Sequence, residues 1–175
     1  MIYYEAPNPM PWIRRPAIFL AGGITGCPQW QMSLIEKLKD QPATIFNPRR
    51  KEFDVSKIEE SRKQIEWEFV ALWMADIVPF WFPKEALCPI ALYELGAHLV
   101  RSKMARAPAV LPKICIGIEP GYQRELDIRF QKDFIAPETP IFVTLDEMAQ
   151  WIDEQVKLYN EEPGPAPKDK AIPPA

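Results

Sequence analysis

Short apolar runs of strand length alternate along this chain with segments of helical periodicity, and this alternation limits the possible folds more than any other feature. The five runs are Ala17–Ala21, Ala43–Phe46, Asp76–Phe82, Lys113–Ile118 and Pro140–Val143. Continuous apolar strands separated by helices are typical of a parallel sheet that is covered on both faces. We therefore predict an α/β fold, a flavodoxin-like or Rossmann-like doubly wound sheet of five parallel strands in the order 2-1-3-4-5.

Helical periodicity marks the segments 30–38, 58–75, 86–103 and 146–160. In the second of these we expect a core-facing stripe of Ile58, Ile65, Phe69, Leu72 and Trp73. The last segment is expected to begin at a cap formed by Thr144 or Asp146. Residues 119–122 are expected to form a turn, and a charged connection follows through Lys132.

Composition excludes several classes of partner and places the chain in a reducing compartment. The net charge of −3 gives no general attraction to a nucleic acid polymer or an anionic membrane, and no apolar run is long enough to span a bilayer. Three well-separated cysteines and a single histidine form neither a disulfide framework nor a zinc site. The N-terminus lacks a basic region and an apolar signal core. We therefore expect a cytoplasmic protein.

Proline defines the expected domain limits. The 20 prolines gather at the two ends and in connections, where they exclude helix. We expect an extended N-terminal arm over residues 1–13, a single α/β domain over residues 14–160, and a mobile Pro-rich tail over residues 161–175.

Two features meet at one edge of the predicted sheet. The first strand runs into the glycine turn Gly22-Gly23-Ile24, and the third is followed by a helix that carries Glu94 among apolar neighbours. In a doubly wound sheet both lie at the switch point, where ligands bind. A charge there costs solvation energy unless it has a partner or a chemical role. The plainer interpretation is that Glu94 complements the helix dipole, which is worth about 0.3–1 kcal/mol.

An ordered set of short motifs resembles the nucleoside 2-deoxyribosyltransferase family. The motifs are Phe19-Leu-Ala-Gly-Gly-Ile24, Glu68, Ala75-Asp76-Ile-Val and Tyr93-Glu-Leu-Gly96, and the resemblance spans about Ile18 to Ala97. It implies an enzyme that moves the 2-deoxyribosyl group of 2′-deoxynucleosides between free nucleobases. It also implies a reaction that uses no metal and no cofactor, and a homo-oligomer with active sites near subunit interfaces.

By this resemblance Glu94 is the nucleophile that attacks C1′ of the sugar and forms a covalent ester, as in retaining glycosidases. Glu68 matches the position of a family aspartate that handles the proton of the leaving or arriving base. Cys88 replaces the aspartate or serine that holds the 5′-group in the family, and a thiol is a poor substitute for either. This change favours unphosphorylated 2′-deoxynucleosides as substrates.

Other positions are weaker candidates for binding substrate. Gly22, Gly23 and Ile24 would border the ligand, and Asn47 and Arg49 flank the same crevice, where Arg49 or Arg50 could pair with a phosphate. Asp76 matches a family position but is equally a turn residue before the third strand. Tyr122 and Asp127 are candidates for contacts made from a neighbouring subunit.

Three hypotheses follow. The first is the transferase. The second is a 2′-deoxynucleoside 5′-monophosphate N-glycosidase, in which water replaces the acceptor base. The third is a non-catalytic nucleotide-binding module, because a fold does not fix a function.

Overall fold

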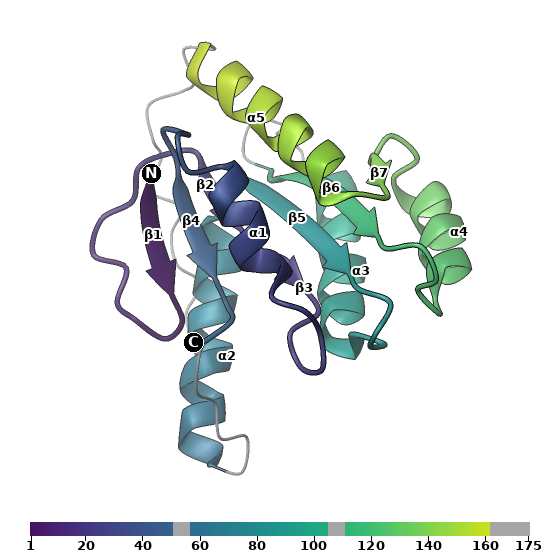
Figure 1. Ribbon diagram of the computed structural model, residues 1–175, viewed down its shortest axis with the longest axis horizontal. Helices are drawn as coiled ribbons and strands as arrows, with labels where there is room; N and C mark the ends of the chain where they lie inside the picture. The colour runs from purple at the N-terminus through teal and green to yellow at the C-terminus, as the bar shows by residue number, and fades with distance from the viewer. Residues whose placement is uncertain (51–56, 105–110, 162–175) are drawn as a thin grey trace.

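The computed structural model describes residues 1–50, 57–104 and 111–161, and it shows a parallel sheet between two layers of helices (Figure 1). The strands are β1 (Ile2–Glu5), β2 (Ala17–Phe19), β3 (Ala21–Gly22), β4 (Thr44–Asn47), β5 (Ile77–Phe82), β6 (Lys113–Ile118) and β7 (Ile141–Phe142). The helices are α1 (Trp30–Lys37), α2 (Ile58–Met74), α3 (Pro89–Met104), α4 (Glu125–Ile135) and α5 (Leu145–Glu161). The Pro-rich tail predicted from residue 161 lies, from residue 162 onward, outside the described residues.

The α/β class and the parallel sheet are confirmed, but the prediction of five strands is wrong. The sheet has seven strands in the order β1-β4-β2-β5-β6-β7, with β3 beside β5. The five predicted runs keep their relative order, and β1 adds an edge strand beside β4, in the segment that we expected to be an arm. The prolines of this segment follow β1, so they remove none of its backbone donors.

The first predicted run forms two strands because it changes neighbours at Leu20. Up to Phe19 it pairs mainly with β4, and the Leu20 amide still donates to the Phe46 carbonyl at 3.0 Å. Beyond Leu20, Ala21 and Gly22 pair with Phe80 and Trp81 of β5. The glycine turn is thereby directed along β5, toward the helix that follows that strand.

Each face of the sheet has its own core. Helices α1 and α5 cover one face with Leu34, Ile35, Ile152 and Val156, packed on strand residues such as Ile18 and Ile45. The other face is covered by α2, α3 and α4 with Trp67, Leu95 and Ile128, packed on Phe19 and Phe80. All six residues of β5 are buried, which explains why this strand reads as a continuous apolar run.

Helix α2 turns a different face to the core from the one that we predicted. Its buried residues are Gln64, Trp67, Ala71 and Leu72. Ile58, Ile65 and Phe69 are exposed, and Trp73 is half-buried beneath the Arg101 guanidinium, which lies 3.9 Å from the ring centroid. Of the predicted stripe only Leu72 is buried, because the apolar side chains of this helix also border a cavity and the outer surface.

Helix α4 was not predicted, and α5 starts at one of the two caps that were. The charged connection predicted after Tyr122 contains helix α4, which is supported by an ion pair between Glu125 and Arg129 at 2.8 Å. Helix α5 starts at a capping box, in which the Glu147 amide donates to Thr144 Oγ1 at 3.2 Å and the Thr144 amide donates to the Glu147 carboxylate at 3.1 Å. None of the described helices is both long and apolar enough to cross a bilayer.

Candidate active site

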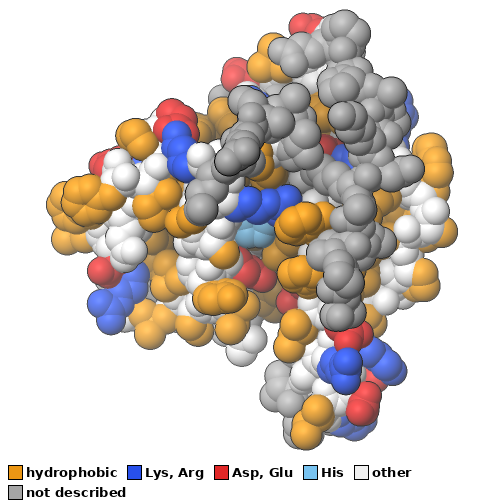
Figure 2. Space-filling model, turned by 180° about the vertical axis from the view of Figure 1, so that it is seen from behind, with side chains coloured by type: hydrophobic (Ala, Val, Ile, Leu, Met, Phe, Trp, Pro, Cys, Tyr) orange, Lys and Arg blue, Asp and Glu red, His pale blue; other side chains and the backbone are white. Residues whose placement is uncertain are grey.

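A cavity of about 640 Å³ opens at the carboxyl ends of β3 and β5, between the glycine turn and helices α2 and α3. Its walls come from Phe19 and the turn residues 21–25, from Pro48 and Arg50 after β4, from four residues of α2, and from residues 86–91 and Glu94 around the start of α3. In Figure 2, acidic side chains and the single histidine of the chain lie in a recess between apolar side chains. The cavity is large enough for a nucleoside-sized ligand.

Glu94 lies on the second turn of α3 and faces the cavity. No hydrogen bond reaches its carboxylate from the part of the chain that the structure describes. Burial, and then the nearby charge of Glu68, raise the pKa of Glu94 from 4.5 to about 8. Glu94 is therefore a carboxyl group whose ionised form costs free energy, as is common for groups that take part in chemistry.

Glu68 enters the same cavity from α2, and its neighbour Gln64 holds it in place. The Gln64 side-chain amide donates to Glu68 Oε1 and to the Pro48 carbonyl, both at 2.7 Å. Burial raises the pKa of Glu68, while the Gln64 hydrogen bond and the charge of Arg50 oppose that rise. The structure thus brings both predicted catalytic carboxylates into one site. Their surroundings differ, because Gln64 and Arg50 stabilise the charged form of Glu68, whereas the charge of Glu68 destabilises the charged form of Glu94. We did not predict Gln64, although its spacing of four residues from Glu68 could have indicated the contact.

The glycine turn is fixed by close packing. A Cβ atom on Gly22, whose φ is +142°, would lie 2.2 Å from the Trp81 carbonyl oxygen, so no larger residue fits beside β5. The Gly23 amide donates to the same carbonyl at 3.1 Å, and the Trp30 indole donates to the Gly23 carbonyl at 2.7 Å. Gly22, Gly23 and Ile24 line the cavity, as expected for a ligand-facing turn.

Of the two adjacent arginines, Arg50 and not Arg49 lines the cavity. The Arg49 guanidinium donates to Gln31 Oε1 at 2.8 Å and to the carbonyls of Pro28 and Ile24 at 2.9 and 3.0 Å, so it ties the glycine turn to α1 and β4. Arg50 pairs with Glu60 at 3.3 Å and stands near Glu68. The structure therefore gives Arg49 a structural role and makes Arg50 the cation beside the ligand space.

Asn47 and Asp76 do not line the cavity. The buried Asn47 amide donates to the Tyr3 hydroxyl at 2.9 Å, and its carbonyl oxygen accepts from the Arg49 amide at 3.0 Å. Asp76 precedes the amino end of β5, whereas the cavity lies at the carboxyl end. There Asp76 pairs with Arg15 at 2.5 Å and accepts a hydrogen bond from the Ala17 amide at 2.8 Å. These contacts agree with the turn interpretation of Asp76.

Cys88 borders the cavity at the start of α3. Its φ of 50° is the one positive value among the described non-glycine residues, and its carbonyl accepts the Leu92 amide at 3.0 Å. Burial raises the pKa of the Cys88 thiol to about 12, so this wall of the cavity is a neutral thiol. A residue held in this conformation next to a cavity is typical of a functional site.

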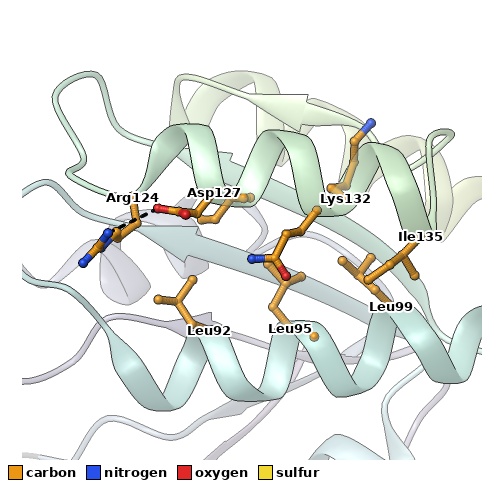
Figure 3. Close-up of a pocket in the computed structure, with 10 residues that line it drawn as sticks. Leu92, Leu95, Leu99, Arg124, Asp127, Lys132 and Ile135 are labelled. Atoms are coloured by element: carbon orange, nitrogen blue, oxygen red, sulfur yellow. Dashed lines mark ion pairs between the residues drawn. The ribbon is translucent and has the colours of Figure 1, made fainter.

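Tyr122 and Asp127 lie away from the carboxylates. The buried Tyr122 hydroxyl donates to the Leu87 carbonyl at 2.8 Å, so it supports the wall of the cavity from behind. Asp127 borders a second cavity of about 280 Å³ between α3 and α4, where it pairs with Arg124 at 3.6 Å above a floor of leucine side chains (Figure 3). Within this chain Asp127 therefore contributes to a separate hollow.

His98 stands one turn beyond Glu94 on α3. Burial and the charge of Arg101 lower the pKa of His98 to about 4, so the ring is neutral at physiological pH. Its Nδ1 atom is buried and has no hydrogen-bond partner among the described residues, and the centroid of its ring lies 6.3 Å from that of Phe80. Among the described residues there is no group of three or more His, Cys, Asp or Glu side chains that could hold a metal ion.

A protein-family model matches this chain. A family model described as nucleoside 2-deoxyribosyltransferase-like matches residues 15–107, which is more than half of the chain. The matched region includes the glycine turn, both carboxylates and Cys88, and it ends before α4. A search of curated proteins finds no match.

Proposed function

Because the chain belongs to the nucleoside 2-deoxyribosyltransferase-like family, we propose that it transfers the 2-deoxyribosyl group of 2′-deoxynucleosides between nucleobases. The observation that carries this proposal is the meeting of Glu94 and Glu68 in one nucleoside-sized cavity at the switch point of the sheet. A binding module would gain nothing from two carboxyl groups whose burial raises their pKa values.

In the first step the Glu94 carboxylate attacks C1′ of the sugar while the N-glycosidic bond breaks. The bonding electrons leave with the base, which takes a proton from Glu68, and a deoxyribosyl ester forms on Glu94. In the second step a nitrogen of the acceptor base attacks C1′ from the opposite side, its proton passes to Glu68, and Glu94 leaves as a carboxylate. Two inversions retain the configuration at C1′.

The electrostatic coupling of the two carboxylates supports these roles. The charge of Glu68 raises the pKa of Glu94, and the interaction between two charges is reciprocal. While Glu94 is ionised, Glu68 is therefore favoured in its protonated form, ready to act as an acid. When Glu94 becomes a neutral ester, this repulsion disappears and Glu68 gives up its proton more readily. The proton is thus delivered at the moment when the base leaves.

The competing function is hydrolysis of 2′-deoxynucleoside 5′-monophosphates, and the position of Arg50 favours it. Its guanidinium lines the cavity, and a planar guanidinium can bind a phosphate through two hydrogen bonds. Against this, Arg50 is already paired with Glu60, and the neutral thiol of Cys88 offers a 5′-phosphate little. We therefore propose unphosphorylated 2′-deoxynucleosides as the preferred donors.

One incubation separates the hypotheses. The protein is mixed with 2′-deoxyadenosine or its 5′-monophosphate, with and without free cytosine, and the products are separated by chromatography. The transferase forms 2′-deoxycytidine from the nucleoside only when cytosine is present. A hydrolase releases free sugar or sugar phosphate without cytosine, and a binding module forms neither product. Faster turnover of the monophosphate would contradict the proposed donor.

We also propose that two or more copies of the chain assemble over the mouth of the cavity. Its rim carries exposed apolar side chains from α2 and α3, including Ile65 and Ile90, which are 64% and 66% exposed. Tyr93, Phe69 and Val100 extend the same outer surfaces of these helices. An apolar surface that surrounds a buried pair of carboxyl groups is suited to a second copy, which would exclude water from the site.

A further inference from the structure

Cys27, just after the glycine turn, and Cys88, just before α3, place their side chains on either side of Gly23. A Cβ atom placed on Gly23 would lie 2.6 Å from Cys88 Sγ and 2.7 Å from Cys27 Sγ, so both sulfurs border the same small space. The pKa of each thiol is also shifted by the other, as expected for two neighbouring sulfurs. Gly23 thus leaves room for a thiol pair, in a chain where both cysteines are free.

Backbone contacts hold both members of the pair in place. The Cys27 carbonyl accepts from the Arg49 guanidinium at 3.3 Å, and the Cys27 amide donates to the Ile24 carbonyl at 3.2 Å. On the other side, Cys88 Sγ donates to the Ala86 carbonyl at 3.3 Å. Two thiols that are fixed close together can form a disulfide with little rearrangement of the backbone.

Both thiols can be reached by a small reagent. Cys27 is half-buried on the outer loop, and Cys88 borders the open cavity. The third cysteine, Cys115, is fully buried in β6 and has no such access. Burial raises the pKa of Cys27 and of Cys88, so neither is a reactive thiolate alone at neutral pH, and their proximity is the feature that favours reaction.

We propose that Cys27 and Cys88 form an oxidative modification site, which a low-molecular-weight disulfide such as oxidised glutathione converts into an intramolecular disulfide. Cys27 attacks the small disulfide and releases one thiol, and Cys88 then attacks the Cys27 sulfur of the mixed disulfide and releases the second. Two protein thiols are oxidised and one small disulfide is reduced to two thiols. The new bond ties the glycine turn to the first residue before α3, two walls of the cavity that holds Glu94.

The expected consequence is a loss of activity, and this part rests on the proposed function. The bond constrains Cys88, whose carbonyl accepts the first backbone hydrogen bond of the helix that carries Glu94. A small displacement of a reacting group lowers the rate steeply. We expect kcat/KM for base exchange to fall by roughly tenfold or more on oxidation and to return with dithiothreitol.

The crosslink is read by mass, independently of any activity. Trypsin places Cys27, Cys88 and Cys115 in three separate peptides, residues 15–37, 85–101 and 114–124. After incubation with oxidised glutathione, we expect the intact chain to lose two hydrogen atoms and peptides 15–37 and 85–101 to be linked. No link, a stable glutathione adduct only, or a link through Cys115 would overturn the proposal.

Cys27→Ser is the matched variant, because Cys27 does not line the cavity. It should exchange bases at the wild-type rate and keep that rate after oxidation. If the linked wild-type protein has unchanged kcat/KM, the modification site stands and its effect on the active site is wrong. If the reduced protein shows no exchange at all, the proposed function fails while the mass result still decides the thiol pair.

Discussion

The pH dependence of the reaction follows from the raised pKa of Glu94. A nucleophilic carboxyl group must be ionised, and Glu94 titrates at about 8 because burial and the charge of Glu68 oppose ionisation. Because the mechanism needs Glu94 ionised and Glu68 protonated, the reactive form of the pair carries one proton. We therefore expect kcat/KM, which reports groups of the free enzyme, to fall as the pH rises above about 8, where the pair loses this last proton. A rate that stays at a plateau above that pH would mean that Glu68 does not donate a proton, and it would remove Glu68 as the acid.

Glu68 is predicted to act on the proton and not on binding. Replacing it by glutamine keeps the size of the side chain and removes the transferable proton, so kcat should fall by about 10²–10⁴-fold while KM changes little. Glu66→Gln is the matched control, because Glu66 lies on the same helix, is exposed and pairs only with Arg62 among the described residues. A Glu68→Gln enzyme with the wild-type rate and pH profile would remove Glu68 from the mechanism.

Among the structural elements, the glycine turn depends on Arg49. Its guanidinium binds several carbonyls of the turn at once, and a lysine ammonium cannot reproduce this planar set of donors. We expect Arg49→Lys to lower the free energy of unfolding by about 1–3 kcal/mol, measured by urea denaturation, and to lower kcat/KM as well. Arg62→Lys, which alters an exposed ion pair, should change both much less. Equal effects of the two substitutions would contradict the structural role of Arg49.

A strand that is buried on both faces could be predicted from sequence because nearly all of its residues are apolar. Every residue of β5 is buried, so the strand appears as an uninterrupted apolar run. Strand β1 contains no such apolar run, since three of its four residues are only half-buried and the other is exposed. Helix α4 was hidden by its charged residues, because only one side of it packs against the domain.

The candidate site was predictable only in part, for two physical reasons. The positions of Glu94 and Glu68 follow from the switch point and the resemblance. Adjacent residues in an extended segment point to opposite sides, however, so the sequence could not decide which of Arg49 and Arg50 faces the cavity. On α2 the apolar residues Ile65 and Phe69 were predicted to be core, because periodicity identifies a face and not what covers it.

At the scale of the whole molecule, we expect chains to associate over the cavity. The outer surfaces of α2 and α3 expose large apolar side chains, with Tyr93 78% exposed beside Glu94. Sedimentation should give a mass well above the 20.2 kDa of one chain, and Tyr93→Asp should shift the protein toward the single-chain mass. Leu158→Asp, which places the same charge at an exposed position of α5, should not. A wild-type monomer with full activity would contradict the assembly.

The covalent ester on Glu94 is the central claim, and its detection is the most direct test. Wild-type protein is mixed with 2′-deoxyadenosine without acceptor, quenched in acid and digested with trypsin. We expect one added deoxyribosyl group on the peptide of residues 85–101, located at Glu94 by fragmentation. Glu94→Gln should show neither the adduct nor base exchange, with an unchanged or higher melting temperature. An adduct on another residue, or wild-type exchange by Glu94→Gln, would contradict the account.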